Sequence, residues 1–209
     1  MPTRILLVRH AETAAPNLLH GSESDIDLSA RGERQAEALG RVLLGEKADG
    51  LVCSGMLRAR RTAAAIGTAT GLEVRVEPAL HERSIGGLSG QEKHIVKTRS
   101  DVWPRTIHRW KAGETSYASE GAESVDDILR RVLPIWSALT AEFDGRKVTV
   151  VAHGMISKVL LLNILPGYSL ADWERFGSIH NCSITDLEWT GSAWQVHRLN
   201  TLAPEVASA

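Results

Sequence analysis

The chain has 209 residues, of which 43% are hydrophobic, and its 24 Lys and Arg residues nearly balance its 25 Asp and Glu residues. This length and hydrophobic content are enough for one sizeable core, and we expect a single domain over residues 1–209. The balanced charge argues against a nucleic-acid partner, and the lack of a long apolar run argues against a membrane partner. The opening MPTRILLVRH has too short an apolar run for a secretory signal, so we expect a cytoplasmic protein.

Two cysteines, Cys53 and Cys182, lie far apart in the sequence. They lack the close spacing of a metal-binding or redox pair, and so few cysteines give little support for a disulfide framework. We therefore expect two reduced, partly buried thiols.

The first half of the chain alternates short apolar runs with helical patterns. Ser29 is a candidate N-cap of one helical segment, and Gly45 follows its end. The predicted elements, in order, are a strand at residues 4–8, a helix at 29–44, a strand at 48–54, a helix at 56–70 and a strand at 72–77. This alternation favours a mainly parallel sheet that is covered on both faces.

The second half begins with a less regular segment at residues 84–121, for which we expect a partly helical insertion that forms a candidate lid. Residues 123–143 then have helical spacing, and Pro134 predicts either a kink in this helix or its division into two pieces. The remaining predicted elements are a strand at residues 147–154, a helix at 155–165 and a hairpin at 183–200. The pattern predicts an α/β fold: a three-layer α/β/α sandwich with a mainly parallel central sheet and the hairpin at one edge.

Charged and titratable side chains follow three of the predicted strands. Arg9 and His10 come directly after the first strand, and His153 and Gly154 lie at the end of a later one. Arg58 falls in the first turn of the helix after another strand, where free backbone N–H groups add a positive potential. Because ligands of open α/β sheets collect where strands end, this pattern predicts an anion site.

Each of these residues, taken alone, also fits a structural role. A histidine after a strand is often a structural residue, Arg58 within the RARR run fits a solvated helix face, and Glu82 in LHERSIGGLSG fits an ordinary loop carboxylate. Their joint placement at strand ends is what favours a functional site.

Seven stretches, in order along most of the chain, resemble the motifs of the histidine phosphatase superfamily, also called the phosphoglycerate mutase-like family. LLVRHAET resembles the Arg-His-Gly-Glu-Thr signature, and CSGMLRARRTA resembles the element that supplies a second arginine. LHERSIGGLSG keeps the family's glutamate with its glycines, and VVAHGMISKVLL resembles the second histidine motif. The other three stretches are DIDLSARGERQAEALG, EGAESVDD and HNCSIT. The resemblance implies a phosphoglycerate mutase-like fold.

The resemblance also implies catalytic roles. His10 would be the nucleophile that forms a phosphohistidine, and a neutral imidazole is competent for this near neutral pH. Glu82 would protonate the leaving oxygen and then take a proton from the water that attacks the phosphohistidine. His153, the third catalytic residue, would surround the phosphoryl oxygens together with Arg9 and Arg58.

The implied phosphoryl-binding residues are Arg9 and Arg58, with Gly154 and Asn17 as further substrate-binding positions. Arginine forks suit the spread-out charge of a phosphoryl group. We expect no metal and no other cofactor, because cationic side chains already neutralise the phosphate and the sequence has no Asp/Glu cluster with the spacing of a magnesium site.

The first departures from the family pattern lie just after His10. Ala11 stands where the family has glycine, which fits if its φ is negative. Asn17 lies one residue later than the family's phosphoryl-binding asparagine, whose place Pro16 takes. The family's arginine in this loop has no clear counterpart, and His20 lies near its position.

Residues 89–117 lack the longer segment, with an arginine pair and a proline-rich piece, that cofactor-dependent mutases of the family carry. This favours hydrolysis. We therefore expect a metal-independent phosphatase of a small phosphorylated metabolite, with a cofactor-dependent phosphoglycerate mutase and a non-catalytic phosphate-binding module as alternatives.

The tryptophans leave two questions open. Trp103 and Trp110 belong to the locally basic insertion, which fits either a solvated helical cover with its tryptophans packed inward or a substrate lid. Trp173, Trp189 and Trp194 fit either a homodimer surface or the core, and core packing is favoured.

Overall fold

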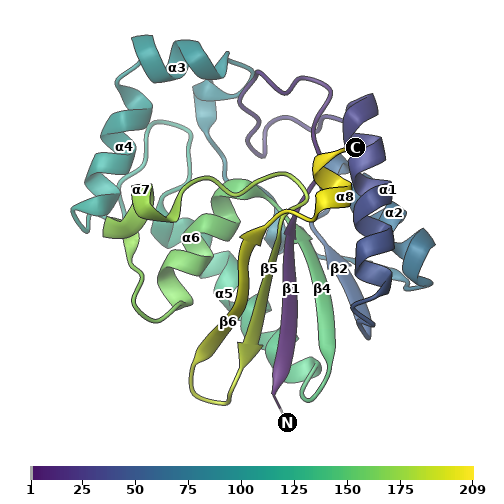
Figure 1. Ribbon diagram of the computed structural model, residues 1–209. Helices are drawn as coiled ribbons and strands as arrows, with labels where there is room; N and C mark the ends of the chain where they lie inside the picture. The colour runs from purple at the N-terminus through teal and green to yellow at the C-terminus, as the bar shows by residue number, and fades with distance from the viewer. Residues whose placement is uncertain (1) are drawn as a thin grey trace.

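The computed structural model describes residues 2–209, the side chain of Arg99 excepted, and its centre is a six-stranded sheet in the order β3-β2-β4-β1-β5-β6 (Figure 1). Neighbours from β3 to β1 are parallel, and β5 and β6 form an antiparallel hairpin at one edge. The strands are β1 (Thr3–Arg9), β2 (Gly50–Cys53), β3 (Val74–Val76), β4 (Lys147–Ala152), β5 (Ile184–Trp189) and β6 (Trp194–Thr201). The predicted mainly parallel sheet with an edge hairpin is confirmed.

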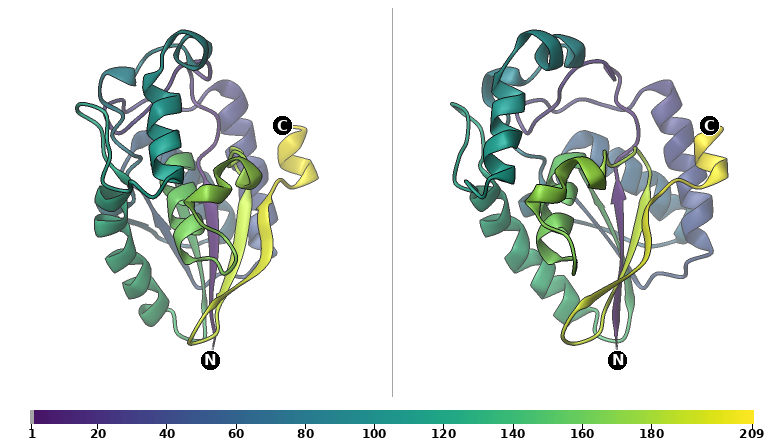
Figure 2. Two further views of the ribbon diagram at one scale, coloured as in Figure 1. Left: turned by 90° about the vertical axis from the view of Figure 1, so that its left-hand side faces the viewer. Right: turned by 60° about the vertical axis from the view of Figure 1, so that its left-hand side comes forward.

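Helices cover both faces of the sheet and give three layers, as predicted (Figure 2). Alternate side chains of β1 serve the two faces: Leu6 and Val8 pack in the core beneath α1 and α2, whereas Ile5 and Leu7 pack in the core beneath α5 and α6. None of the helices within residues 2–209 is long and apolar enough to cross a membrane. The helices are α1 (Ala30–Leu44), α2 (Leu57–Thr70), α3 (Lys93–Arg99), α4 (Val102–Lys111), α5 (Val125–Glu142), α6 (Gly154–Ile164), α7 (Trp173–Phe176) and α8 (Pro204–Ala207), with short 3₁₀ helices η1 (Pro78–Leu80), η2 (Gly86–Leu88) and η3 (Leu170–Asp172).

Two local predictions about helices have different outcomes. Ser29 caps α1 as expected, since its hydroxyl accepts a hydrogen bond from the Gly32 N–H at 2.9 Å. The division of a helix at Pro134 is wrong, because α5 runs unbroken through this proline. Pro134 lies on the exposed side of α5, where water can satisfy the Arg130 carbonyl that loses its helical partner.

The insertion at residues 84–121 contains η2, α3 and α4. Trp110 of α4 is fully buried in the main core and meets Trp173 edge-on at 5.7 Å, and Trp103 packs partly against the same core. Both tryptophans therefore pack inward, which agrees with the interpretation of this insertion as a solvated helical cover. The lid stays a prediction.

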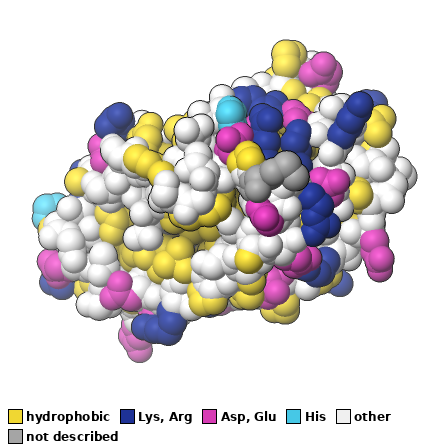
Figure 3. Space-filling view, turned by 90° about the horizontal axis from the view of Figure 1, so that it is seen from below, with side chains coloured by type: hydrophobic (Ala, Val, Ile, Leu, Met, Phe, Trp, Pro, Cys, Tyr) yellow, Lys and Arg dark blue, Asp and Glu magenta, His cyan; other side chains and the backbone are white. Residues whose placement is uncertain are grey.

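Trp173 and Trp194 are buried in the core and Trp189 is half-buried against it, so core packing is confirmed. An open groove of about 800 Å³ lies at the N-terminal end of β1 and is partly walled by Leu133, Trp136, Ile164, Trp189 and Trp194. Figure 3, seen from this end, shows hydrophobic side chains gathered in a hollow. The homodimer surface stays a prediction.

Both cysteines are unpaired, as expected, but they are fully buried rather than partly buried. Cys53 ends β2, and Cys182 precedes β5. Burial raises the pKa of Cys53 to about 11 and the pKa of Cys182 to about 12. Both thiols are therefore protonated near neutral pH and are poor nucleophiles.

Gly32 lets α1 pack directly on the backbone that follows His10. A Cβ atom at Gly32 would lie 2.0 Å from the carbonyl oxygen of Glu12. We expect Gly32→Ala to lower the free energy of unfolding by about 1–3 kcal/mol, although alanine is the better helix former, because backbone must move to make room. Urea unfolding measures the change, with Gly87→Ala, which meets nothing within 4 Å, as the control. Equal stabilities of the two variants would contradict this packing.

Candidate active site

The two histidines of the predicted anion site meet because β1 and β4 are parallel neighbours. Arg9 pairs in register with Ala152, so His10 and His153 follow the two strands at the same edge of the sheet. The His10 N–H donates to the Ala152 carbonyl at 3.0 Å, and the two imidazole rings lie 5.1 Å apart. The structure thus brings together two side chains that are separated by most of the chain.

His10 is buried and neutral. Its Nδ1 donates to the Ala11 carbonyl at 2.7 Å, which leaves the lone pair on Nε2. Burial, together with the positive charges of Arg9 and Arg58, holds the pKa of His10 well below its ordinary value of 6.5. The ring therefore presents an unprotonated nitrogen near neutral pH.

His153 is fully buried at the N-cap of α6. Its Nε2 lies 2.7 Å from the Ser54 hydroxyl, and its Nδ1 has no hydrogen-bond partner among the described residues. Burial, the nearby His10 and several cations hold the pKa of His153 well below its ordinary value. Ser54 accepts the Met56 N–H at 3.3 Å and keeps its own hydrogen as a donor; when that hydrogen goes to Nε2, the ring hydrogen of His153 lies on Nδ1.

Arg9 is held at the end of β1 by the segment before β5. One terminal nitrogen donates to the Ile179 carbonyl at 2.5 Å, while the buried Nε has no partner among residues 2–209. Burial lowers the pKa of Arg9, and the negative charge of Glu82 opposes that shift. A Cβ atom at Gly154 would lie 3.2 Å from Arg9 Nε, so this glycine allows the guanidinium to pass close to the start of α6.

Arg58 is 1% exposed and is no solvated helix face. Its two terminal nitrogens donate to the carbonyls of Ser24 at 2.8 Å and Gly21 at 3.2 Å. Its buried Nε has no partner in the part of the chain that the structure describes. Burial lowers the pKa of Arg58, which is opposed mainly by the charge of Glu82. A loop therefore fixes this cation and leaves a donor free.

Glu82 reaches the first turn of α6, directly after His153. Its carboxylate accepts the N–H groups of Met155 and Ile156, both at 3.1 Å, and that of Arg83 at 2.9 Å. The positive end of the helix thus holds a buried carboxylate beside the two histidines and the two arginines. The structure brings Arg9, His10, Arg58, Glu82 and His153 into one cluster.

Asn17 lies apart from these contacts. Its side chain is exposed and has no hydrogen-bond partner among the described residues, and its carbonyl accepts the Lys93 N–H at 2.9 Å. It lines a surface cavity of about 640 Å³ between residues 14–18 and 92–94. Its substrate-binding role stays a prediction.

His20 and Ala11 form hydrogen bonds next to the cluster, His20 within its own loop and Ala11 through its backbone. His20 Nε2 lies 2.8 Å from the Ala15 carbonyl and Nδ1 lies 3.0 Å from the Ser24 hydroxyl, so both ring nitrogens brace the loop. Ala11 has a negative φ, as its side chain requires, and its N–H donates to the Thr62 hydroxyl at 3.0 Å. Within residues 2–209, no three His, Cys, Asp or Glu side chains are grouped so that they could hold a metal ion.

The sequence did not single out two residues that orient the cluster. Asn181 donates from Nδ2 to the His10 carbonyl at 2.8 Å, and Ser54 contacts His153. Asn181 belongs to the HNCSIT stretch and Ser54 ends the second strand run, so both lay within recognised patterns. Their contacts span 171 and 99 residues of sequence, which no local pattern reports.

The buried histidines make folding sensitive to acid. In the folded protein, burial holds the pKa values of His10 and His153 well below 6.5, whereas in the unfolded chain both rings titrate near it. Below about pH 6.5 the unfolded state therefore binds more protons, and the free energy of unfolding falls as pH falls. We expect the urea midpoint to decline from about pH 7 to about pH 5, and to decline less in His10→Gln. An equal decline in both proteins would contradict a neutral buried His10.

Comparisons with known proteins agree with this geometry. The family model of the histidine phosphatase superfamily (branch 1) matches residues 5–202. A probable phosphoglycerate mutase of Erwinia tasmaniensis is 29% identical over 200 residues, which cover 92% of this chain and 90% of the relative. A 2,3-bisphosphoglycerate-dependent phosphoglycerate mutase of Methylobacterium radiotolerans is 33% identical over 213 residues, or 96% of this chain and 91% of the relative.

Among solved structures, the native mycobacterial glucosyl-3-phosphoglycerate phosphatase has a TM-score of 0.81 and 28% identity, with 97% of this chain and all of the other covered. Its name and those of the two relatives divide between phosphatases and mutases. The matches extend over nearly the whole chain and agree with the α/β architecture. The protein is a member of the histidine phosphatase superfamily, branch 1.

Proposed function

We propose that the protein is a phosphatase that hydrolyses a small phosphorylated metabolite through a phosphohistidine on His10. The observation that carries this proposal is a neutral imidazole with its Nε2 lone pair free, set beside two arginines whose buried Nε groups have no partner among the described residues. Such a site attracts an anion and presents a nucleophile to it. The phosphatase among the similar solved structures supports the same reaction class.

In the first step, His10 Nε2 attacks phosphorus, an N–P bond forms, and the bond from phosphorus to the leaving oxygen breaks. Glu82 gives its proton to that oxygen. In the second step, water attacks the phosphohistidine, Glu82 takes a proton from the water, and inorganic phosphate leaves with His10 restored. The proton that Glu82 gives in one step is thus recovered in the next.

The phosphoryl oxygens would be held by three donors. The Nε groups of Arg9 and Arg58 and the Nδ1 of His153 are buried without partners among the described residues, and each can donate one hydrogen bond. Because protein carbonyls already fix both guanidinium groups, little reorganisation is needed when charge develops on the phosphoryl group. This preorganised positive site supplies the electrostatic part of catalysis.

A phosphoglycerate mutase is the second candidate, because the two curated relatives carry that name. The two reactions share the phosphohistidine and differ in whether water or a second hydroxyl group receives the phosphoryl group. The deciding experiment incubates the protein with 3-phosphoglycerate in EDTA, with and without a bisphosphoglycerate primer, and follows inorganic phosphate and the isomeric acid. Phosphate release that needs no primer supports the phosphatase, whereas primer-dependent isomer formation without phosphate release supports the mutase.

The role of Glu82 predicts a dependence on the leaving group. We expect Glu82→Gln to lower kcat/KM for an alkyl phosphate on the order of 100-fold, and to change kcat/KM for an aryl phosphate only a few-fold. An aryl oxide leaves without a proton, and kcat/KM reports the steps up to phosphoryl transfer. The control is Glu73→Gln, which changes an exposed carboxylate outside the cluster. Equal losses on both substrates would refute Glu82 as the acid.

A further inference from the structure

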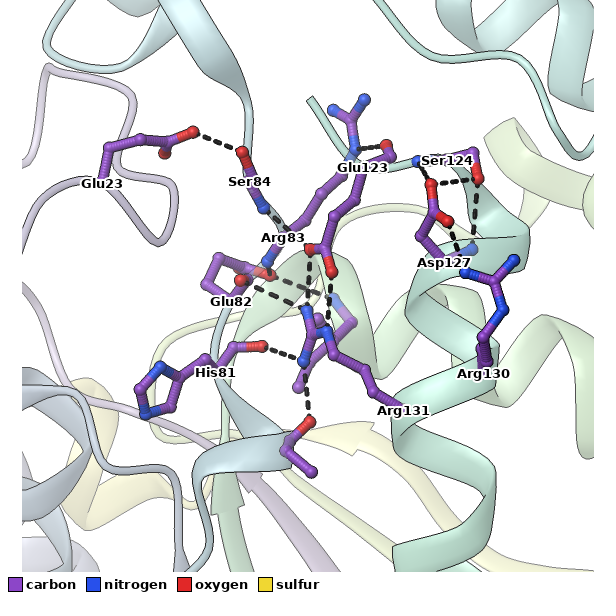
Figure 4. A network of polar contacts seen from close by, with 12 residues as sticks. Glu23, His81, Glu82, Arg83, Ser84, Glu123, Ser124, Asp127, Arg130 and Arg131 are labelled. Atoms are coloured by element: carbon purple, nitrogen blue, oxygen red, sulfur yellow. Dashed lines mark hydrogen bonds and ion pairs between the residues drawn. The ribbon is translucent and has the colours of Figure 1, made fainter. Parts of the chain in front are cut away.

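The Gly-x-Glu-Ser stretch of the sequence forms contacts that the proposed chemistry has not used. Glu123, in this stretch, and Arg131 of α5 form a partly buried ion pair behind Glu82 (Figure 4). Arg131 Nε donates to one carboxylate oxygen of Glu123 at 2.7 Å, and a terminal nitrogen donates to the other at 2.9 Å. Such a two-point contact fixes the plane of the guanidinium.

The remaining donors of Arg131 hold the backbone on which Glu82 lies. One terminal nitrogen donates to the carbonyls of Ala79 at 2.7 Å and His81 at 2.8 Å, and the other reaches the Glu82 carbonyl at 3.3 Å. Residues 81–84 form no helix or strand, so a ladder of backbone hydrogen bonds does not fix them. The Arg131 guanidinium helps to hold this segment in place through its bonds to the backbone carbonyls.

Glu123 holds the other side of the same segment. Its carboxylate accepts the Ser84 N–H at 2.9 Å, and its backbone carbonyl accepts Arg83 Nε at 2.8 Å. The Arg83 guanidinium also lies over the Trp110 ring, 4.7 Å from its centroid. The ion pair therefore forms hydrogen bonds with the chain both before and after Glu82.

We propose that Arg131 and Glu123 are positioning residues, which set the distance between the Glu82 carboxyl group and the leaving oxygen. This inference rests on the proposed acid–base role of Glu82. Among the contacts that hold residues 79–84, two act as anchors for Glu82: the ion pair holds the backbone, and the N–H groups of Met155 and Ile156 hold the Glu82 carboxylate. Glu23 also accepts the Ser84 hydroxyl at 2.6 Å. A displacement of about 1 Å at a reacting group costs on the order of 100-fold in rate, so loss of the first anchor weakens proton donation.

The nucleophile and the phosphoryl-binding groups take their own hydrogen bonds from residues other than this pair. Arg9 is held by Ile179, and Arg58 by Gly21 and Ser24. His10 is oriented by the carbonyl of Ala11. Loss of the ion pair is therefore expected to impair proton donation while phosphoryl transfer to His10 continues, which is the signature of a fault at Glu82 alone.

The test measures kcat/KM for an alkyl phosphate and an aryl phosphate in Arg131→Met and Glu123→Gln. We expect each variant to lose about 10-fold to 100-fold on the alkyl phosphate and only a few-fold on the aryl phosphate. Arg131→Lys is expected to recover part of the alkyl activity, because lysine keeps the charge without the fork. Arg130→Met is the matched control: Arg130 is next on α5, its side chain is 72% exposed, and it pairs with Asp127.

Double variants separate positioning from a merely structural role. If Arg131 acts through Glu82, Arg131→Met adds no further loss on the alkyl phosphate in a Glu82→Gln background. Additive losses, or equal losses on both substrates, would overturn the inference. If Glu82→Gln itself lost kcat/KM equally on the alkyl and the aryl phosphate, the acid role of Glu82, on which the inference rests, would be overturned instead. Should Arg131→Met fail to fold, Glu123→Gln, which keeps the shape of the side chain, decides between these outcomes.

Discussion

His10→Ala is expected to abolish phosphate release, with a loss of more than about 100-fold in kcat on every substrate. The substitution removes the nitrogen that accepts the phosphoryl group, and no other group in the cluster can replace it. The Nε2 of His153 is engaged by the Ser54 hydroxyl at 2.7 Å, and the cysteine thiols are buried and protonated.

The fold should survive this substitution, because most contacts at residue 10 come from its backbone. The His10 N–H binds the Ala152 carbonyl, and the His10 carbonyl accepts Asn181. Circular dichroism and urea unfolding check that His10→Ala remains folded. His197→Ala, at an exposed histidine of β6 that pairs with Glu188, is the matched control and should keep full activity. A His10→Ala protein that retains more than about a hundredth of the wild-type rate would rule out His10 as the nucleophile.

Arg58→Met is expected to lower kcat/KM on the order of 100-fold or more. The methionine fills much of the same space but offers no donor to the phosphoryl group. It also leaves the carbonyls of Gly21 and Ser24 without their donor, so part of the loss arises from a loop that is less well held. Steady-state kinetics of phosphate release measure the total.

Arg58→Lys separates charge from geometry. Lysine has one charged nitrogen, so it cannot bind the carbonyls of Gly21 and Ser24 and keep a separate donor for the substrate, as the guanidinium does. We expect it to recover only a small part of the activity. Arg60→Met, an exposed arginine on the same helix, is the control and should be unchanged. Full activity of Arg58→Lys would mean that only the charge matters.

The sequence could predict which strand ends carry chemistry, because a buried apolar run followed by Arg9 and His10 is a local pattern. It could not specify that β1 and β4 are neighbours. That pairing places His10 beside His153, and it depends on the packing of both faces of the sheet. The family resemblance implied that His10 and His153 act at one site, and the register of Arg9 with Ala152 explains how the fold brings them together.

Contacts between distant segments are what local patterns miss. The RARR run fits a solvated face, yet Arg58 is buried because two carbonyls of the loop before α1 receive its guanidinium. Asn181 orients His10 across almost the whole chain. At Pro134 the expectation of a divided helix was wrong, because the exposed side of α5 tolerates a missing hydrogen bond.

The central claim is a covalent phosphohistidine at His10, and trapping it tests the account most directly. Glu82→Gln should accept the phosphoryl group from an aryl phosphate, which needs no proton donor, and should then hydrolyse the intermediate slowly for lack of a base. Rapid quenching into base followed by mass spectrometry is expected to show one added phosphoryl group on the peptide that contains His10, and none in the Glu82→Gln protein that also carries His10→Ala. Turnover without a phosphorylated enzyme, or phosphorylation of another residue, would contradict the mechanism.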